Sequence, residues 1–408
     1  MNGTTTVTGM NNQAVVFTDR LEESATRQLV ALCDSEDFSG STIRVMPDVH
    51  AGAGCGVVGL TMTLDGKVDP DMVGVDIGCG MLTTRIKDRE IDFQKLDYAI
   101  RRLIPSGFNV RDTPCESPLR DELGLDRLKC VGSISLKHAE LSLGTLGGGN
   151  HFIEVERDSE GRHLLVIHSG SRKLGLNVAG FYSKKAAGKV ARERKAERYS
   201  VIAGLKAKGL EREIADTLKR MPPTADEGIP FVSGKDFEDY IHDMTIAQRY
   251  AGRNRMLMAD IILKAMDWDV EGRFETVHNY IDTGSMILRK GAVSANRGQL
   301  LLVPINMRDG SLLCRGLGNE DWNRSAPHGA GRLMSRREAR QRLSVKDYVD
   351  GMKGVWTTSA GTDTLDEAPG AYKDIDDIIF NIGPTAEIVD RLMPVYNFKA
   401  PGGPRMWS

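Results

Sequence analysis

Glycine sets the strongest constraint on how this chain folds, because it is frequent and gathers around polar side chains. The 408 residues include 44 glycines, against roughly 29 expected at average usage. The surplus falls in clusters such as PDVHAGAGCG, GVDIGCGM, GTLGGGNHFIE, HSGSR and HGAGR. Glycine lets a backbone approach a ligand closely. These clusters therefore predict that distant parts of the chain meet at one site.

The segments between the clusters mix helical and β-like patterns and predict an α+β fold. Helices are expected at 93–104, 236–266 and 335–343, after Ser344 and after Pro384, and β character at 41–64, 151–168 and 275–303. These regions would form mixed β-sheets flanked by helices. The length alone favours two or three domains, at about 150 residues for each.

A helical, basic stretch separates two β-rich halves of the chain. From Lys184 to Arg220 there are 12 Lys/Arg and 5 Asp/Glu. Residues 177–266 are therefore predicted to be a helical insertion. Such a charge run is usually a solvated helix face, and contact with nucleic acid is the alternative. The whole chain has a net charge of −2, so contact with nucleic acid would require a local basic face.

A hairpin pattern at 151–168 brings two histidines together. In HFIEVERDSEGRHLLVIH two β-rich runs flank DSEG, where Gly161 suits a left-handed turn position. If the turn centres on residues 159–160, His151 and His168 lie opposite each other, to within a one-residue bulge. This pairing predicts that both histidines serve one site.

Five residues with metal-binding side chains fall in these clusters: Asp76, Cys79, His151, His168 and His278. A carboxylate, a thiolate and three imidazoles exceed what one four-coordinate ion needs. Two ions that share the thiolate would use the set economically. Affinity alone would favour zinc. For any single histidine the alternative is a structural residue in a strand or core.

His328 is a candidate nucleophile. It stands in PHGAGR, and Arg332 and Arg336 follow. Exposed amides at a glycine turn bind phosphate oxygens, and arginines add bidentate contacts. A neutral imidazole there could attack phosphorus and form a phosphoramidate. The alternative is a glycine turn with a capping histidine.

Several classes of protein are disfavoured. No run of about 18 apolar residues is present, and the start of the chain lacks an apolar leader. The six cysteines form no CxxC pair, so a reduced, cytoplasmic protein without membrane contact is expected. GTLGGGN matches neither a Walker A loop nor a dinucleotide-binding fingerprint.

Taken in order, VGVDIGCGM, GNHFIE, HSGSR, HNY, RKGAVSA, HGAGRLMSR and DEAPGAYKD resemble the motifs of the RtcB family of GTP-dependent RNA ligases. The resemblance runs from about Val45 to Lys399. It implies one RtcB-like catalytic domain over 1–408, interrupted by the helical insertion. It also implies that RNA 3′-phosphate or 2′,3′-cyclic phosphate ends are joined to 5′-hydroxyl ends, in RNA repair or tRNA splicing. GTP would react through a histidine–GMP intermediate.

The resemblance also implies a role for individual residues, and two Mn²⁺ ions in place of zinc. Cys79 would bridge the ions, Asp76 and His151 would complete one site, and His168 and His278 the other. His328 would carry GMP. The guanylate pocket would comprise Asn150, His151, Phe152, Ile153, Glu154, His278, Asn279, Pro304, Ile305, Asn306, Met307, Ser311, His328, Gly329, Ala330, Gly331, Tyr372 and Lys399. RNA phosphates would be bound by Arg172, Arg332 and Arg336.

Three features depart from the family pattern. PINMRDGS at 304–311 stands where a small Gly-Ser pair is common, the chain continues past Lys399, and Cys55 replaces a residue that is usually not cysteine. Two alternatives stay open: a dinuclear metal-dependent phosphoesterase, which has no use for His328, and an inactive relative that binds RNA or GTP. The sequence identifies neither the natural RNA nor an activating protein partner.

Overall fold

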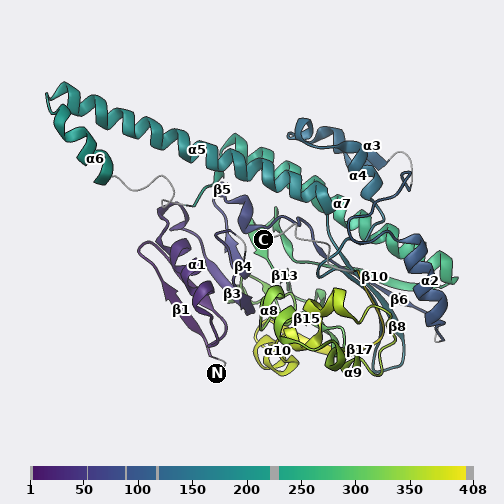
Figure 1. Ribbon diagram of the computed structural model, residues 1–408. Coiled ribbons are helices and arrows are strands. Elements are labelled where there is room, and N and C mark those ends of the chain that lie inside the picture. Colours follow the sequence, from purple (N-terminus) through teal and green to yellow (C-terminus); the bar gives the residue numbers. More distant parts are fainter. Residues whose placement is uncertain (1–2, 53, 88–89, 116–118, 221–228, 401–408) are drawn as a thin grey trace.

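Two β-sheets and a pair of long helices organise the computed structural model of the chain (Figure 1). It describes residues 3–52, 54–87, 90–115, 119–220 and 229–400. The six-stranded sheet has the order β1 (Thr5–Thr8), β2 (Gln13–Val16), β3 (Ile43–His50), β4 (Val58–Thr63), β12 (Ile287–Lys290) and β11 (Asn279–Asp282). Helix α1 (Glu23–Asp34) packs against this sheet through its buried Leu29 and Leu32.

The seven-stranded sheet has the order β10 (Val270–Val277), β6 (Gly80–Ile86), β8 (His163–Ser169), β7 (Phe152–Arg157), β17 (Ala386–Lys399), β15 (Gly310–Gly316) and β14 (Leu300–Asn306). Helices α2 (Phe93–Leu103) and α7 (Lys235–Met266) cover one of its faces. There Ile100, Met258 and Ile262 of the helices pack with Ile153 and Ile167 of the strands. The mixture of sheets and flanking helices confirms the predicted α+β class.

The helical insertion begins earlier than predicted. Helix α5 (Arg172–Ala207) starts directly after β8, and α6 (Ile214–Arg220) follows it. The first half of α5 lies beside α7 and buries Leu174, Val178 and Tyr182, whereas its second half extends beyond both sheets (Figure 1). Pro222 and Pro223, which follow this basic stretch in the sequence, lie outside the described residues.

The shorter elements complete the fold. Strand β5 (Lys67–Val68) pairs with β9 (Val232–Ser233), and β13 (Ala292–Ser294) with β16 (Ser325–Pro327). The remaining α-helices are α3 (Leu119–Leu123), α4 (Leu136–Ser142), α8 (Arg336–Arg342), α9 (Val345–Gly351) and α10 (Ile375–Ile382). Helices α8 and α9 confirm the predictions for 335–343 and after Ser344. No helix among the described residues is long and apolar enough to cross a membrane.

The segment after Pro384 is a strand, so the helix predicted there is wrong. The first half of β17, up to Leu392, pairs with β15, and its second half, from Met393, pairs with β7, so the strand joins these two parts of the sheet. A register shift after Pro394 accommodates the proline, which has no N–H to give to a ladder. Apolar residues in EIVDRLMPVYNF fit a helix or a strand. The two neighbouring strands decide between these states.

The predicted hairpin forms with a register one residue from the symmetrical expectation. Strands β7 and β8 pair Phe152 with His168, so Phe152 and not His151 lies opposite that histidine. The loop 158–162 has an odd number of residues, and Gly161 takes the predicted left-handed conformation, with φ of +79°. The observed register therefore differs from the symmetrical one by a single residue, which is the tolerance stated in the prediction. His151 precedes β7, so its side chain does not have to follow the alternation of side chains along that strand.

Candidate functional site

Adjacent strands bring the predicted metal-binding residues together. Cys79 immediately precedes β6, His151 immediately precedes β7, and His168 lies near the end of β8. These three strands are neighbours in the seven-stranded sheet. His278 lies between β10 and β11, where the chain passes from the seven-stranded to the six-stranded sheet. The site therefore forms at the junction of the two sheets.

Asp76 reaches the cluster from the tight turn that precedes β6. The amide of Cys79 donates to the carbonyl of Asp76 at 3.1 Å, which confirms that both stand in one turn. The Asp76 carboxylate contacts His151 Nε2 at 2.9 Å and accepts a bond from the Ser171 amide at 3.1 Å. Burial is the largest single influence and would raise the pKa of Asp76, but the contacts with His151, Cys79 and Arg172 together lower it.

The turn requires glycine at position 78. Gly78 has φ of +73°, and a Cβ there would lie 2.8 Å from the Gln248 backbone of α7. A side chain would be strained by the backbone conformation and would collide with the helix. Gly78 therefore lets the Asp76–Cys79 turn lie directly against α7.

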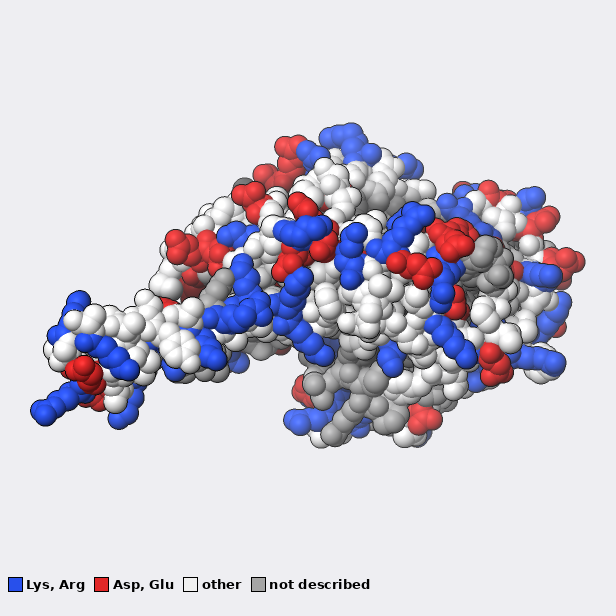
Figure 2. Space-filling view, turned by 90° about the horizontal axis from the view of Figure 1, so that it is seen from above, with Lys and Arg blue, Asp and Glu red and all other residues white. Residues whose placement is uncertain are grey.

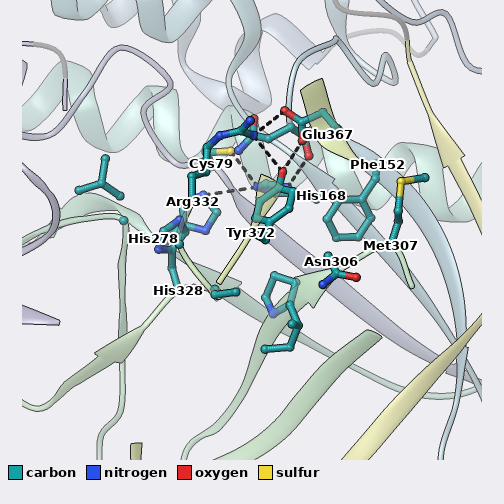
Figure 3. Close-up of a pocket in the computed structure, with 18 of the residues that line it drawn as sticks. Cys79, Phe152, His168, His278, Asn306, Met307, His328, Arg332, Glu367 and Tyr372 are labelled. Atoms are coloured by element: carbon teal, nitrogen blue, oxygen red, sulfur yellow. Dashed lines mark hydrogen bonds and ion pairs between the residues drawn. The ribbon is translucent and has the colours of Figure 1, made fainter. Parts of the chain in front are cut away.

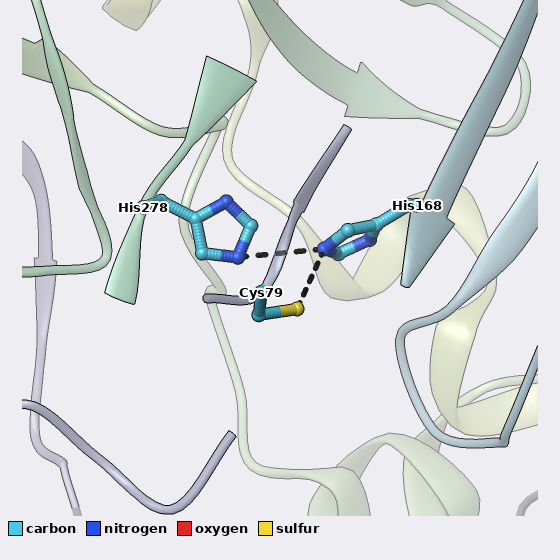
Figure 4. Close-up of side chains that lie close together, drawn as sticks. All are labelled: Cys79, His168 and His278. Carbon is cyan, nitrogen blue, oxygen red and sulfur yellow. Dashed lines mark hydrogen bonds between the residues drawn. The ribbon is translucent and has the colours of Figure 1, made fainter. Parts of the chain in front are cut away.

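The ligand atoms form two groups that share Cys79. One group is Cys79, His168 and His278, and the other is Asp76, Cys79 and His151; within each group the donor atoms lie within 4.8 Å of one another. Cys79 Sγ is 3.5 Å from His151 Nε2 and 3.3 Å from His168 Nε2. The Nε2 atoms of His168 and His278 face each other at 3.4 Å (Figure 4).

The hydrogen bonds of the histidines test whether metal ions fit here. His151 Nδ1 lies 2.8 Å from the Leu146 carbonyl, and His168 Nδ1 lies 3.1 Å from the Asn150 carbonyl. A carbonyl oxygen only accepts, so each Nδ1 carries the hydrogen and each Nε2 points a lone pair at Cys79. Burial also keeps the pKa of His168 well below its usual value, which favours the neutral ring that metals bind.

Converging lone pairs repel unless a proton or a cation lies among them. The sharing of Cys79 between the two groups fits a pair of ions better than one ion. The residues present are therefore compatible with bound metal.

Helix α7 ties the loops of this site together. The buried guanidinium of Arg255 donates to the carbonyls of Gly78 at 2.8 Å and Ser169 at 2.7 Å. Next to it, the Asn254 amide nitrogen donates to the Thr145 carbonyl at 3.1 Å. Segments before β6, before β7 and at the end of β8 are thus fixed to one helix. Neither Asn254 nor Arg255 was assigned a role from the sequence.

His328 follows β16 and is held by a buried carboxylate. Its Nδ1 lies 2.6 Å from Asp48 Oδ2, and its backbone amide donates to the same oxygen at 3.1 Å. Asp48 is fully buried at the end of β3. The carboxylate accepts, so Nδ1 carries the hydrogen and Nε2 keeps its lone pair. The His328 ring lies next to His278, with ring centroids 5.0 Å apart.

A cavity of about 350 Å³ connects His328 with the metal-binding residues (Figure 3). This volume lies within the range of small-molecule sites. Most of the residues predicted from the sequence line it: Asp76, Cys79, Asn150, Phe152, Glu154, His168, His278, Asn279, Pro304, Ile305, Asn306, Met307, His328, Gly329, Ala330, Gly331, Arg332, Arg336, Tyr372 and Lys399.

Four predicted residues lie off the cavity wall. Ile153 points to the opposite face of β7 and packs in the core beneath α7, because side chains alternate along a strand. Ser311 is fully buried, and its hydroxyl donates to Glu156 at 2.6 Å. Arg172 donates to the Gly107 carbonyl at 2.9 Å. His151 belongs to the metal-binding cluster behind the wall.

Glu367 organises the cationic side of the cavity. Its buried carboxylate lies 2.8 Å from Lys399, 3.1 Å from Arg336 and 3.3 Å from Arg332, and it accepts a hydrogen bond from the Tyr372 hydroxyl (Figure 3). Burial alone would raise the pKa of Glu367, but these cations lower it to about 2. A carboxylate is therefore present at neutral pH and fixes the cations around it.

Two further carboxyl groups lie along β7. Glu154 reaches the cavity and accepts a bond from Asn397 at 2.7 Å, and burial raises the pKa of Glu154 to about 7. Glu156, two residues along the same face, is buried against Ser311, and burial raises its pKa well above the usual value.

Sequence reasoning missed three functional candidates: Asp48, Glu367 and Lys290. Asp48 stands in PDVH, Glu367 in DEAPGAYKD and Lys290 in RKGAVSA, so each was inside a recognised motif without a role of its own. Lys290 lines the cavity, and burial lowers its pKa to about 8. Each of the three is a charged residue among apolar residues or glycines. Since charged residues are rarely buried without a partner, this context could have indicated a role in the site.

Comparison with known proteins gives consistent matches over most of the chain. The family model described as "tRNA-splicing ligase RtcB" matches residues 35–128 and 120–400. The chain is 31% identical to the RNA-splicing ligase RtcB of Escherichia coli (strain K12), over 92% of this chain and 94% of that protein. It is 27% identical to the tRNA-splicing ligase RtcB of Archaeoglobus fulgidus, over 92% of this chain and 91% of that protein.

Proposed function

We propose, on the premise that this chain belongs to the RtcB family of tRNA-splicing ligases, that it joins RNA 3′-phosphate or 2′,3′-cyclic phosphate ends to 5′-hydroxyl ends with GTP. The observation that carries this proposal is His328. Its Nδ1 is held by Asp48, and the ring borders a nucleotide-sized cavity beside a metal-binding cluster. A hydrolase built on the same cluster would have no use for such a nucleophile.

In the first step His328 attacks GTP. The Nε2 lone pair forms a bond to the α-phosphorus, the bond from that phosphorus to the bridging oxygen breaks, and pyrophosphate leaves. The imidazole gains positive charge as the bond forms. Asp48, 2.6 Å from Nδ1, stabilises that charge and fixes the reactive tautomer.

In the second step the GMP moves to the RNA. An oxygen of the RNA 3′-phosphate, released from the cyclic form by hydrolysis, attacks the phosphorus on His328, and the nitrogen–phosphorus bond breaks. The RNA 5′-hydroxyl then attacks the activated 3′-phosphate and GMP leaves. Two Mn²⁺ ions, held by Cys79 with Asp76 and His151 and by Cys79 with His168 and His278, would offset charge on the phosphoryl oxygens.

The remaining predicted residues suit a guanylate. The Glu154 carboxyl can accept from the N–H groups of guanine, and the Tyr372 ring offers a face for the base. Lys399 and the amides of HGAGR suit phosphate oxygens. Arg332 and Arg336, which Glu367 positions, are proposed to contact RNA phosphates.

The test of this proposal is covalent labelling with [α-³²P]GTP and Mn²⁺ followed by denaturing electrophoresis. The wild-type protein should acquire an acid-labile GMP adduct, His328→Ala should acquire none, and the control His138→Ala, on α4, should label normally. Cys79→Ala should label at background level and should lose bound Mn²⁺ in a metal assay, because both ligand groups share this residue.

Absence of an adduct on the wild-type protein contradicts the ligase mechanism. Hydrolysis of RNA phosphate esters without any adduct would instead support the dinuclear phosphoesterase. A labelled Cys79→Ala protein with normal Mn²⁺ content would contradict the shared ligand.

A further inference from the structure

The basic arm, defined here as residues 187–220, has no part in the chemistry proposed above. It consists of the end of α5, the short helix η5 (Glu211–Glu213) and α6. In Figure 1 it extends past both sheets, with α6 at its far end. None of its described side chains is buried. A helix that packs against so little is not held there by a hydrophobic core.

The arm is basic on a chain that is otherwise acidic. Residues 187–220 hold 10 of the 54 Lys/Arg and 5 of the 56 Asp/Glu. The remainder of the chain therefore holds 44 basic against 51 acidic residues. Figure 2 shows Lys and Arg side chains at the tip of the projecting arm and where it meets the body. The positive charge is concentrated on this element.

The charges on α5 are also segregated around the helix. At about 100° for each residue, Lys184, Arg192, Lys195 and Lys206 fall within an arc of about 80°, whereas Lys189 and Arg194 fall outside it. Glu197 falls on the opposite side of the helix by the same reckoning. The side chains of the four residues within the arc and of Glu197 are exposed. Evenly mixed charges would be enough for a solvated helix, whereas one basic stripe suits an extended polyanion.

The same helix begins at the proposed catalytic centre. Its N-cap residue, Ser171, donates its amide to Asp76, and its first residue is Arg172. From there its 36 residues extend about 54 Å at the usual helical rise. An RNA whose ends lie at the Cys79 cluster can therefore run along α5 toward the arm.

We propose that the basic arm binds the phosphate backbone of a helical stem in the RNA whose ends are joined. The inference rests on the proposed function and adds the substrate class, a structured RNA. A duplex fits better than a single strand because Tyr199 is the arm's one aromatic residue. Proteins that bind single strands stack successive bases on several aromatic rings, whereas duplex RNA is read through phosphates and shape.

The test compares three triple variants of the full chain. The first replaces Arg192, Lys195 and Lys206 by Gln. The second keeps their charge, as Arg192→Lys, Lys195→Arg and Lys206→Arg. The third removes three exposed lysines elsewhere, as Lys137→Gln, Lys264→Gln and Lys346→Gln. Dissociation constants are measured by fluorescence anisotropy at several salt concentrations, for a nicked RNA hairpin and for a short single strand with the same ends.

The Gln triple should bind the hairpin about 10-fold more weakly at low salt, with a log–log salt slope smaller by about 3. Its affinity for the single strand should be unchanged, and the other two triples should bind both RNAs like the wild type. Formation of the GMP adduct without RNA should be equal in all four proteins, and it reports on the proposed function independently.

Equal hairpin affinity and slope in the Gln triple and the wild type would overturn the proposal. So would an equal loss in the Lys137, Lys264 and Lys346 triple, or a wild type that does not prefer the stem. If the arm serves a protein partner instead, the Gln triple will bind RNA normally.

Discussion

At the scale of single residues, buried carboxylates control the site. Asp48 faces the candidate nucleophile, Glu367 faces three cations, and Glu154 faces the cavity. Each lies in an environment that is costly for a charge without a partner. The partner is an imidazole for Asp48, three cations for Glu367 and an amide for Glu154. The three carboxyl groups therefore differ in how readily they take up a proton.

Asp48→Asn should slow formation of the GMP adduct by about 100-fold or more, since orientation and charge stabilisation of a reacting imidazole are worth this much. An amide can accept from Nδ1 only in one orientation and supplies no negative charge. The measurement is the single-turnover rate of adduct formation at saturating GTP, with Asp374→Asn at the start of α10 as a control. A wild-type rate in Asp48→Asn would show that the 2.6 Å contact has no part in the step.

Glu367 gives stability a defined pH dependence. Its pKa in the folded protein, about 2, lies below the usual value of 4.5. Its contribution is therefore present above about pH 4.5 and is lost as the pH falls toward 2. Glu367→Gln should lower the free energy of unfolding by roughly 3 kcal/mol at pH 7.

The measurement is urea unfolding of Glu367→Gln and wild type at pH 7 and at pH 3. The difference between the two proteins should shrink at pH 3, where the wild-type carboxylate begins to lose its advantage. Asp363→Asn, in the same η7 helix (Thr362–Glu367) but exposed, serves as the control. A difference that stays constant with pH would contradict the ionic role of Glu367.

At the scale of elements, α7 acts as the frame of the metal-binding cluster. Its residues Asn254 and Arg255 bond to the loops that carry Cys79, His151 and His168. The helix was predicted within one residue of its observed start, because its apolar period is regular. Its role in the site depends on Asn254 and Arg255, two polar residues that face the sheet. The spacing of apolar residues, from which the helix was predicted, does not single them out.

Arg255→Lys should weaken Mn²⁺ binding by about 10- to 100-fold, as is usual when groups behind metal ligands are replaced. Lysine keeps the charge, but it has a single donor nitrogen and cannot hold Glu275, as Arg255 Nε does at 3.2 Å, while it also reaches the carbonyls of Gly78 and Ser169. Isothermal titration with Mn²⁺ measures the effect, and Arg249→Lys, exposed on the same helix, is the matched control. Equal Mn²⁺ affinities in the two variants would contradict this role.

At the scale of the whole molecule, two sheets meet and the chain crosses between them at His278. Segments from residue 48 to residue 399 line one cavity or hold its nucleophile. We propose that residues 1–408 form one catalytic domain for this reason, with 177–266 as its helical insertion. The arm then gives one catalytic unit a second, distant contact with its substrate.

The sequence by itself marked the candidate residues of the site. Glycine-flanked polar clusters marked Cys79, His168, His278 and His328, because backbone that must approach a ligand needs glycine. The regular helices were also predictable, since a 3.6-residue period is a local property.

Only the tertiary structure decided the rest. It made 386–399 a strand, because β7 and β15 offered two partners to a sequence that fits either state. It turned Ile153 away from the cavity, since the register of β7 fixes which side chains face inward. It brought Asp48 to His328 and Glu367 to Lys399, because a buried carboxylate and its partner meet through the fold and not through the spacing of the chain.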